Sequence, residues 1–133
     1  MKKKKKILFI EDERHFQDML STIFKDEGFE TFSAYNGVDG VKIAEEESPD
    51  IILCDLVLPK KDGFNVINEL KNNPKLFNIP IIILTNLEEN QNVEKVLSSG
   101  AKMYLVKANY TLDDIVAKVK DTLEINNNQK NEG

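Results

Sequence analysis

The chain has 133 residues, of which 41% are hydrophobic and 31% charged, which is the size and composition of one globular domain. Its net charge of −5 is uneven, because Lys2 to Lys6 carry five positive charges and leave −10 on the rest. An acidic body disfavours general nucleic-acid binding, and no apolar run approaches the roughly 20 residues of a membrane span, so we expect neither a nucleic-acid nor a membrane partner.

The lysine run is similar to the start of a secretory signal, but the apolar stretch behind it is only Ile7 to Ile10. Three acids, residues 11–13, interrupt that stretch well short of the apolar core of a signal peptide. The lysines are interpreted as a solvated flank of the first strand. The single cysteine, Cys54, excludes an internal disulfide and is predicted to be a small buried hydrophobe, which favours a cytoplasmic location.

Five runs of strand length follow one another along the chain. They occupy residues 6–10, 29–34, 50–55, 79–85 and 102–106. The second run alternates weakly, whereas the other four are almost continuously apolar, as parallel strands buried on both faces are.

Helical stripes, with apolar residues three and four positions apart, separate and follow these runs. The first stripe is Phe16, Met19, Leu20, Ile23 and Phe24, and the last is Leu112, Ile115, Val116, Val119 and Leu123. Shorter stripes begin at Val38, Phe64 and Val93, and all of them are interpreted as core-facing. Gly28, Ser48-Pro49 and Gly100 mark helix ends, while Thr111 and Asp114 resemble a capping box before the last helix, with Asp in place of Glu.

Strand and helix thus alternate five times. This order predicts an α/β fold with a parallel sheet, helices on both faces and right-handed crossovers. We expect one domain over residues 1–125 and a polar, disordered tail over residues 126–133.

Ionisable and hydroxyl side chains stand where four of the expected strands end. They are Glu11, Asp12, Asp55, Thr85 and Lys107. The carboxyl ends of parallel strands meet at one edge of the sheet, where ligands bind, so we expect these groups to converge. The structural alternative for Asp55, which interrupts the apolar run IILCDLVLP, is a turn cap at a strand end.

This set of groups suits phosphoryl transfer. Carboxylates held close together need a cation, and their oxygen atoms suit Mg²⁺. Lys107 supplies a charge for phosphate oxygens, and the Thr85 hydroxyl can donate a hydrogen bond to one of them. Asp55 can act as the nucleophile without a general base, so positioning and charge neutralisation complete the predicted site.

The segments ILFIEDE, DLVLPKKDG, ILT and GAKMYLVK occur in this order, and through them residues 5–125 resemble the receiver domain of bacterial response regulators, of the chemotaxis-regulator type. The resemblance implies a flavodoxin-like sheet with strand order 2-1-3-4-5. It also implies that Asp55 is the phospho-acceptor of a two-component system. Asp12 would ligate Mg²⁺ directly and Glu11 through water, with the carbonyl of Val57 as a further ligand.

The same resemblance assigns roles around the acceptor. Thr85 and Lys107 would bind the phosphoryl group, and Pro59 and Gly63 would shape the loop after the acceptor. Tyr104 would be a switch residue that turns inward when Thr85 moves, altering the face made by helix 4, strand 5 and helix 5. The alternative for Tyr104 is a half-buried side chain without a switching role.

The implied partners are a sensor histidine kinase or a histidine phosphotransfer protein, and an unidentified protein target. The chain would accept the phosphoryl group itself and lose it slowly, without being an enzyme in any other sense. We expect a stand-alone receiver that is a monomer or a weak homodimer.

Several positions depart from the family pattern. Ala108 replaces the usual proline after Lys107, so the peptide bond between them is predicted to be trans and the loop that follows to be rearranged. Asn86 replaces a small residue and is expected to crowd the acceptor. Val57 and Leu87 are apolar and cannot position an attacking water, which predicts a long-lived phosphoryl-aspartate.

The sequence allows two alternatives to a phosphorylated receiver. The first is a binding module of the same fold that does not use phosphate, an alternative that Asn86 and Ala108 leave open. The second is an enzyme of the same topology, which is disfavoured because D-x-D, a Ser/Thr/Gly-rich phosphate loop and G-x-G-x-x-G are all missing after the first strand. The only histidine, His15, is predicted to be a surface or rim residue.

Overall fold

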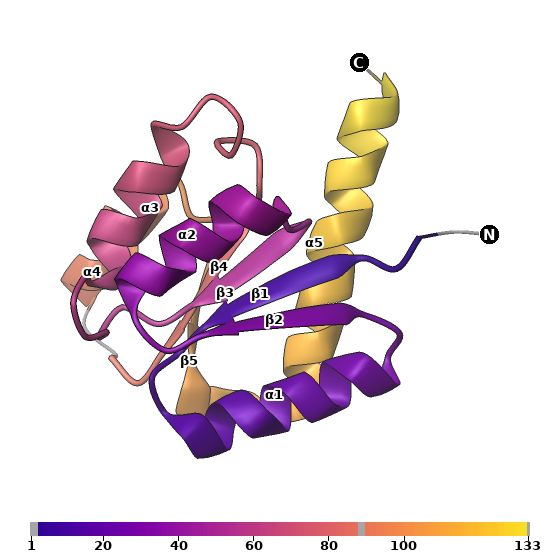
Figure 1. Cartoon of the computed structure of the whole chain (residues 1–133). Coiled ribbons are helices and arrows are strands. Elements are labelled where there is room, and N and C mark those ends of the chain that lie inside the picture. Colours follow the sequence, from indigo (N-terminus) through magenta and orange to yellow (C-terminus); the bar gives the residue numbers. More distant parts are fainter. Residues whose placement is uncertain (1–2, 88–89, 133) are drawn as a thin grey trace.

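Strands and helices alternate along the chain in the computed structural model, which describes the backbone of residues 3–87 and 90–132 (Figure 1). The side chains of residues 90–92 and 125–132 lie outside this description. The strands are β1 (Lys6–Ile10), β2 (Glu30–Ala34), β3 (Ile51–Cys54), β4 (Ile81–Thr85) and β5 (Met103–Val106). The helices are α1 (Arg14–Asp26), α2 (Gly37–Glu47), α3 (Gly63–Lys71), α4 (Asn90–Ser98) and α5 (Leu112–Glu132), with a 3-10 turn at Lys107–Asn109.

All strand pairs are parallel, and the strand order is β2-β1-β3-β4-β5, which confirms the predicted topology. The register aligns the last residues of the strands. Ile10, at the end of β1, lies opposite both Ala34 and Cys54, and Thr85 lies opposite Val106. The residues that follow β1, β3, β4 and β5 are therefore delivered to a single edge of the sheet.

The two faces of the sheet are covered by different helices (Figure 1). Successive strand residues point to opposite faces, so Leu8 and Ile52 belong to one buried cluster and Ile7 and Ile51 to the other. The first cluster joins the sheet to residues of α2, α3 and α4, and the second joins it to residues of α1 and α5. The apolar stripes predicted from the sequence thus face the sheet from both sides, but the prediction is wrong for Val38, which begins the α2 stripe and is 45% exposed.

Local signals end the helices where the sequence predicts. Gly28 and Gly100 have φ values of +92° and +118°, a conformation that glycine adopts without a steric penalty. The capping box is present, because the Thr111 N–H donates to Asp114 Oδ2 at 2.9 Å and the Asp114 N–H donates to Thr111 Oγ1 at 3.1 Å. These bonds fix the start of α5 directly after the turn that carries Lys107.

The N-terminal lysines agree with the prediction from the sequence, whereas the C-terminal residues differ from it. Lys3, Lys4 and Lys5 are exposed, as a solvated flank should be, whereas Lys2 lies outside the described residues. At the other end α5 continues to Glu132, so the backbone of residues 126–132 is helical where a disordered tail is predicted. The domain boundary at residue 125 remains a prediction. Among the described residues, no helix combines the length and apolarity needed to cross a membrane.

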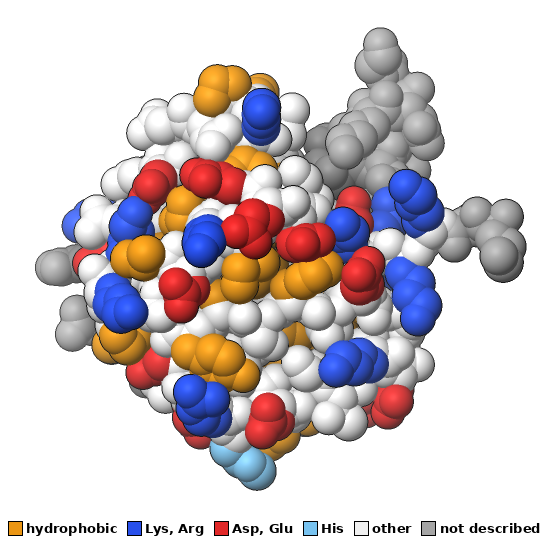
Figure 2. All heavy atoms as spheres, in the orientation of Figure 1, with side chains coloured by type: hydrophobic (Ala, Val, Ile, Leu, Met, Phe, Trp, Pro, Cys, Tyr) orange, Lys and Arg blue, Asp and Glu red, His pale blue; other side chains and the backbone are white. Residues whose placement is uncertain are grey.

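The face over α2 carries charges of both signs. Figure 2 shows acidic and basic side chains interspersed with apolar ones on this face, without a continuous basic surface. Cys54 is buried at the end of β3, and burial raises the pKa of its thiol far above the usual range. Cys54 is thus the small buried hydrophobe that the sequence predicts.

Candidate functional site

A cavity of about 270 Å³ opens at the carboxyl edge of the sheet. Its wall combines residues that follow four different strands. They are Glu11, Asp12 and Glu13 after β1, Asp55 and Val57 after β3, Thr85, Asn86 and Leu87 at the end of β4, and Lys107 after β5. The fold therefore brings together the five side chains that the sequence places at strand ends.

Asp55 lies at the floor of this edge and is 7% exposed. Its N–H continues the sheet by donating to the Ile10 carbonyl at 3.0 Å. Its carboxylate accepts hydrogen bonds at both oxygen atoms, from the Val57 N–H to Oδ1 at 3.2 Å and from Lys107 Nζ to Oδ2 at 3.1 Å. The acid that interrupts the apolar run is thus paired, which offsets the cost of burying it.

Lys107 bridges two acids, because its ammonium also donates a hydrogen bond to Glu11 Oε1. Its side chain is only 10% exposed. Burial alone would lower the pKa of Lys107, but the hydrogen bond to Glu11 and the negative charge of Asp55 outweigh burial and raise it. Lys107 is therefore a firmly charged group between two carboxylates.

At Glu11, in contrast to Lys107, the effect of burial on the pKa outweighs the effect of the hydrogen-bond partners. Glu11 is 4% exposed, and burial raises the pKa of its carboxyl, although hydrogen bonds from Lys107 and from the Glu13 N–H act in the other direction. The nearby charge of Asp55 adds to the increase. The site thus holds more negative charge than a single ammonium can compensate.

Asp12 completes the acidic group and is exposed at its rim. One carboxylate oxygen from each of Glu11, Asp12 and Asp55 lies within 4.8 Å of the others. Three carboxylates beside one ammonium leave two negative charges, and carboxylate oxygens are the ligands that Mg²⁺ prefers. The residues present therefore fit a divalent cation of this kind.

Tight packing shapes the loop after Asp55. A Cβ atom on Gly63 would lie 2.5 Å from the Asp55 carbonyl oxygen, so only glycine allows α3 to start this close to Asp55. The Pro59 carbonyl accepts hydrogen bonds from the Gly37 N–H at 3.3 Å and the Lys61 N–H at 2.7 Å. The loop is thereby fastened to the start of α2.

Thr85 and Tyr104 lie on neighbouring strands and meet at one residue of the β4–α4 loop. The Leu87 N–H reaches Thr85 Oγ1 at 3.5 Å, while the Leu87 carbonyl accepts a hydrogen bond from the Tyr104 hydroxyl at 2.7 Å. Thr85 is 1% exposed and lines the cavity, whereas Tyr104 is half-buried and packs against the cluster under α2, α3 and α4. Leu87 therefore joins the predicted switch residue to the site.

The structure shows the conformation or exposure of three residues that depart from the family pattern, Ala108, Asn86 and Val57. No cis peptide bond occurs among the described residues, so the bond between Lys107 and Ala108 is trans, as predicted. The residues after β5 form a 3-10 turn. Asn86 is exposed at the mouth of the cavity, and Val57, with 61% of its surface exposed, forms an apolar lip beside Asp55.

Two residues of α1 that the sequence does not single out for the site touch it. Phe16 is predicted as core, yet its ring centroid lies 4.7 Å from Lys107 Nζ. Gln17 is fully buried, and its Nε2 lies within 3.2 Å of the carbonyl oxygens of Phe9, Glu11 and Ala34, so it ties α1 to the ends of β1 and β2. A polar residue inside an apolar stripe is a signal for Gln17, whereas nothing in the sequence distinguishes Phe16 from its neighbours in the stripe.

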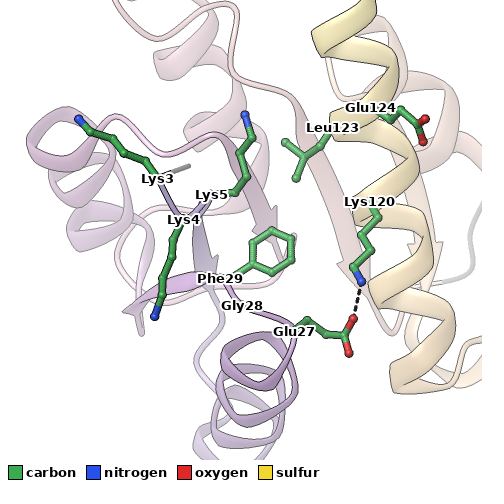
Figure 3. A pocket seen from close by; sticks show the side chains of 9 residues that line it. All are labelled: Lys3, Lys4, Lys5, Glu27, Gly28, Phe29, Lys120, Leu123 and Glu124. Atoms are coloured by element: carbon green, nitrogen blue, oxygen red, sulfur yellow. Dashed lines mark hydrogen bonds and ion pairs between the residues drawn. The ribbon is translucent and has the colours of Figure 1, made fainter. Parts of the chain in front are cut away.

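Two further hollows lined by described residues lack such converging groups. One of them, about 490 Å³, lies at the opposite edge of the sheet and is lined by Lys3, Lys4, Lys5, Glu27, Gly28, Phe29, Lys120, Leu123 and Glu124 (Figure 3). Its N-terminal lysines point in different directions, and Lys120 is paired with Glu27 (Figure 3). His15 is exposed, as predicted, and lies on a groove along α1 outside the acidic cavity.

Comparison with known proteins agrees with this geometry. The sequence profile of one protein family, described as the response regulator receiver domain, matches residues 7–120. A signal receiver domain of a histidine kinase from Syntrophus aciditrophicus is 30% identical, with a TM-score of 0.82 over 90% of each chain. A two-component response regulator from Clostridium difficile is 26% identical, with a TM-score of 0.84 over 91% of this chain and 97% of that one. A receiver domain from Methanospirillum hungatei JF-1 has the same fold, with 24% identity and a TM-score of 0.89 over 96% and 99% of the two chains.

Proposed function

Because this chain belongs to the response regulator receiver domain family of two-component signalling, we propose that Asp55 accepts a phosphoryl group in a reaction that depends on Mg²⁺. The observation that carries the proposal is that Asp55 lies beside the Lys107 ammonium and two further carboxylates in one cavity. The donor is a phosphohistidine on a sensor kinase or on a histidine phosphotransfer protein.

The chemistry follows from these contacts. An Asp55 carboxylate oxygen attacks phosphorus, a P–O bond forms, and the P–N bond to the donor imidazole breaks, with the imidazole taking up a proton from solvent. The Lys107 ammonium can bind the phosphoryl oxygens, because it already contacts Asp55 Oδ2, next to which they would lie. The Thr85 hydroxyl lines the same cavity and can donate to another phosphoryl oxygen. Positioning and neutralisation of charge are what this reaction requires of a protein.

The metal site is proposed at the acidic group. Asp12 would bind Mg²⁺ directly, Glu11 through water, and Asp55 and the carbonyl of Val57 would complete the protein ligands. When bound, the ion supplies positive charge that lessens the repulsion between the carboxylates and the incoming phosphoryl group. The two negative charges left by Lys107 support this assignment.

A switch through Tyr104 is the proposed output. If the Thr85 hydroxyl turns toward the phosphoryl group, the Leu87 N–H loses the contact that it now has with Thr85 Oγ1. The Leu87 carbonyl, which holds the Tyr104 hydroxyl, would move with it. The face made by α4, β5 and α5 would then present a changed surface to a protein target.

The first experiment measures intact mass after incubation with acetyl phosphate and Mg²⁺, beside the variant Asp55→Asn. We expect a gain of one phosphoryl group in the wild-type protein only, and slow loss of that group in a chase, because Val57 and Leu87 are apolar. Phosphorylation should also shift the NMR signals of Tyr104 and Leu87. A folded protein that gains no phosphoryl group and binds no Mg²⁺ would instead be a phosphate-independent binding module, and rapid loss of the label would contradict the predicted lifetime.

A further inference from the structure

Phe16 has a contact that its place in the apolar stripe does not predict. It lies in the first turn of α1, is half-buried, and packs against the cluster shared by α1, α5 and the sheet. Its ring also faces the site, since Lys107 Nζ lies 4.7 Å from the ring centroid. At this distance the electron-rich face of an aromatic ring attracts a cation.

The surroundings strengthen this attraction. The Lys107 ammonium donates to carboxylate oxygens of Glu11 and Asp55 as well as contacting the ring, and its side chain is only 10% exposed. Water therefore competes weakly for the ammonium, and a cation–π contact is stronger when the cation is desolvated. A leucine could fill the same space against the core, but it would not attract the ammonium.

We propose that Phe16 is a positioning residue for phosphoryl transfer, whose ring holds the Lys107 ammonium between Glu11 and Asp55. This inference rests on the proposed phosphorylation of Asp55 and deepens it. Phe16 itself touches no reacting atom, so it acts through Lys107.

Loss of the Phe16 ring should change Mg²⁺ affinity and the rate of phosphoryl transfer in opposite directions. Lys107 and Mg²⁺ neutralise the same carboxylates, so a ring that holds the ammonium there opposes binding of the ion. Loss of the ring should therefore tighten Mg²⁺ binding. It should also slow phosphoryl transfer at saturating Mg²⁺, because Lys107 is no longer held where the phosphoryl oxygens arrive. If the substitution only disturbed the packing of the site, both the Mg²⁺ affinity and the rate of phosphoryl transfer would fall.

The test compares the wild-type protein with Phe16→Leu and with proteins that carry mono-, di- or trifluorophenylalanine at residue 16. Fluorination weakens the attraction of the ring for a cation while nearly keeping its shape. We expect Phe16→Leu to bind Mg²⁺ about threefold more tightly by calorimetry and to be phosphorylated by acetyl phosphate about tenfold more slowly. The fluorinated proteins should fall between these limits in the order of their fluorine content.

A matched control is Phe32→Leu, because Phe32 is a partly buried ring on β2 with Lys6 Nζ at 5.7 Å from its centroid. Both measured values should stay within about twofold of the wild-type protein in this variant. A flat fluorinated series, or a joint loss of affinity and rate in folded Phe16→Leu, would overturn the proposal.

One further measurement separates this inference from the proposed function. In buffer without Mg²⁺ or phosphodonor, the ¹⁵N-attached ammonium protons of Lys107, identified by their absence in Lys107→Arg, should exchange with water faster in Phe16→Leu than in the wild-type protein. If the wild-type protein accepts no phosphoryl group, the proposed function fails. Faster exchange would then still support the contact between Phe16 and Lys107, and unchanged exchange would refute it.

Discussion

The two edges of the sheet carry the same kinds of ion pair in opposite surroundings. At the carboxyl edge Lys107 pairs with Glu11 and Asp55, and these side chains are 10%, 5% and 9% exposed. At the amino edge Lys120 pairs with Glu27, and their side chains are 52% and 37% exposed (Figure 3). Water screens the outer pair, whereas the inner group interacts strongly and carries a desolvation cost. Burial, more than residue type, separates the candidate site from an ordinary surface.

Removing the central cation should give the largest effect. Lys107→Met leaves Glu11 and Asp55 buried without their shared partner, and we expect the free energy of unfolding at pH 7 to fall by about 3 kcal/mol. The same change at the amino edge, Lys120→Met, removes a screened pair and should cost less than about 0.5 kcal/mol. Urea unfolding without Mg²⁺ measures both values. Equal losses would show that the difference in burial does not govern these pairs.

Glycine substitutions compare the backbone at the two edges. In Gly63→Ala the new Cβ would lie 2.5 Å from the Asp55 carbonyl oxygen and 2.7 Å from Leu56 Cα, so the backbone itself must shift, at about 2 kcal/mol. In Gly28→Ala the Cβ has nothing within 4 Å, and only the φ of +92° is strained, at about 1 kcal/mol. Thermal unfolding ranks the two variants. Phosphorylation should slow only in Gly63→Ala, because that shift displaces the acceptor, and a slower reaction in Gly28→Ala would contradict this.

Neutralising one acid should give the smallest of these changes in the free energy of unfolding, and its size should depend on pH. Burial raises the pKa of Glu11 in the folded protein, so the folded state binds this proton more readily than the unfolded state. The stability that Glu11 contributes is present below its ordinary pKa and is lost as the pH rises through the raised value. Glu11→Gln should therefore be more stable than the wild-type protein at pH 7 without Mg²⁺, by about 1 kcal/mol, and equally stable near pH 4.

Added Mg²⁺ provides the control for this last comparison. It should stabilise the wild-type protein by mass action and stabilise Glu11→Gln less, because a ligand has been weakened. A stability difference that does not change between pH 4 and pH 7 would contradict the assignment of the effect to the Glu11 carboxyl.

Much of the fold was predictable because its signals are local. Continuous apolar runs such as residues 6–10 and 79–85 contain the observed strands, and Thr111 with Asp114 caps α5 as expected. Residues 126–132 are an exception, because their polar composition predicts a disordered tail while their backbone continues α5. Composition reports how little apolar surface a segment can bury, but a helix that is already formed can be extended one hydrogen bond at a time.

The candidate site was predictable for a different reason. Asp55, Thr85 and Lys107 are far apart in the sequence, yet the rule that parallel strands deliver their carboxyl ends to one edge brings them together. The contacts of Phe16, Gln17 and Leu87 could not be inferred in this way. Their sequence patterns describe which face of an element is buried, but not which neighbour occupies the space opposite.

The sequence by itself determined the order of the elements, the faces that they bury and the residues that reach the carboxyl edge, since apolar spacing and strand ends are properties of the chain. Only the tertiary structure decided that Lys107 bridges Glu11 and Asp55 against the ring of Phe16, and that Leu87 joins Thr85 to Tyr104. These contacts depend on how helices seat on the sheet and on the rotamers that close packing leaves available.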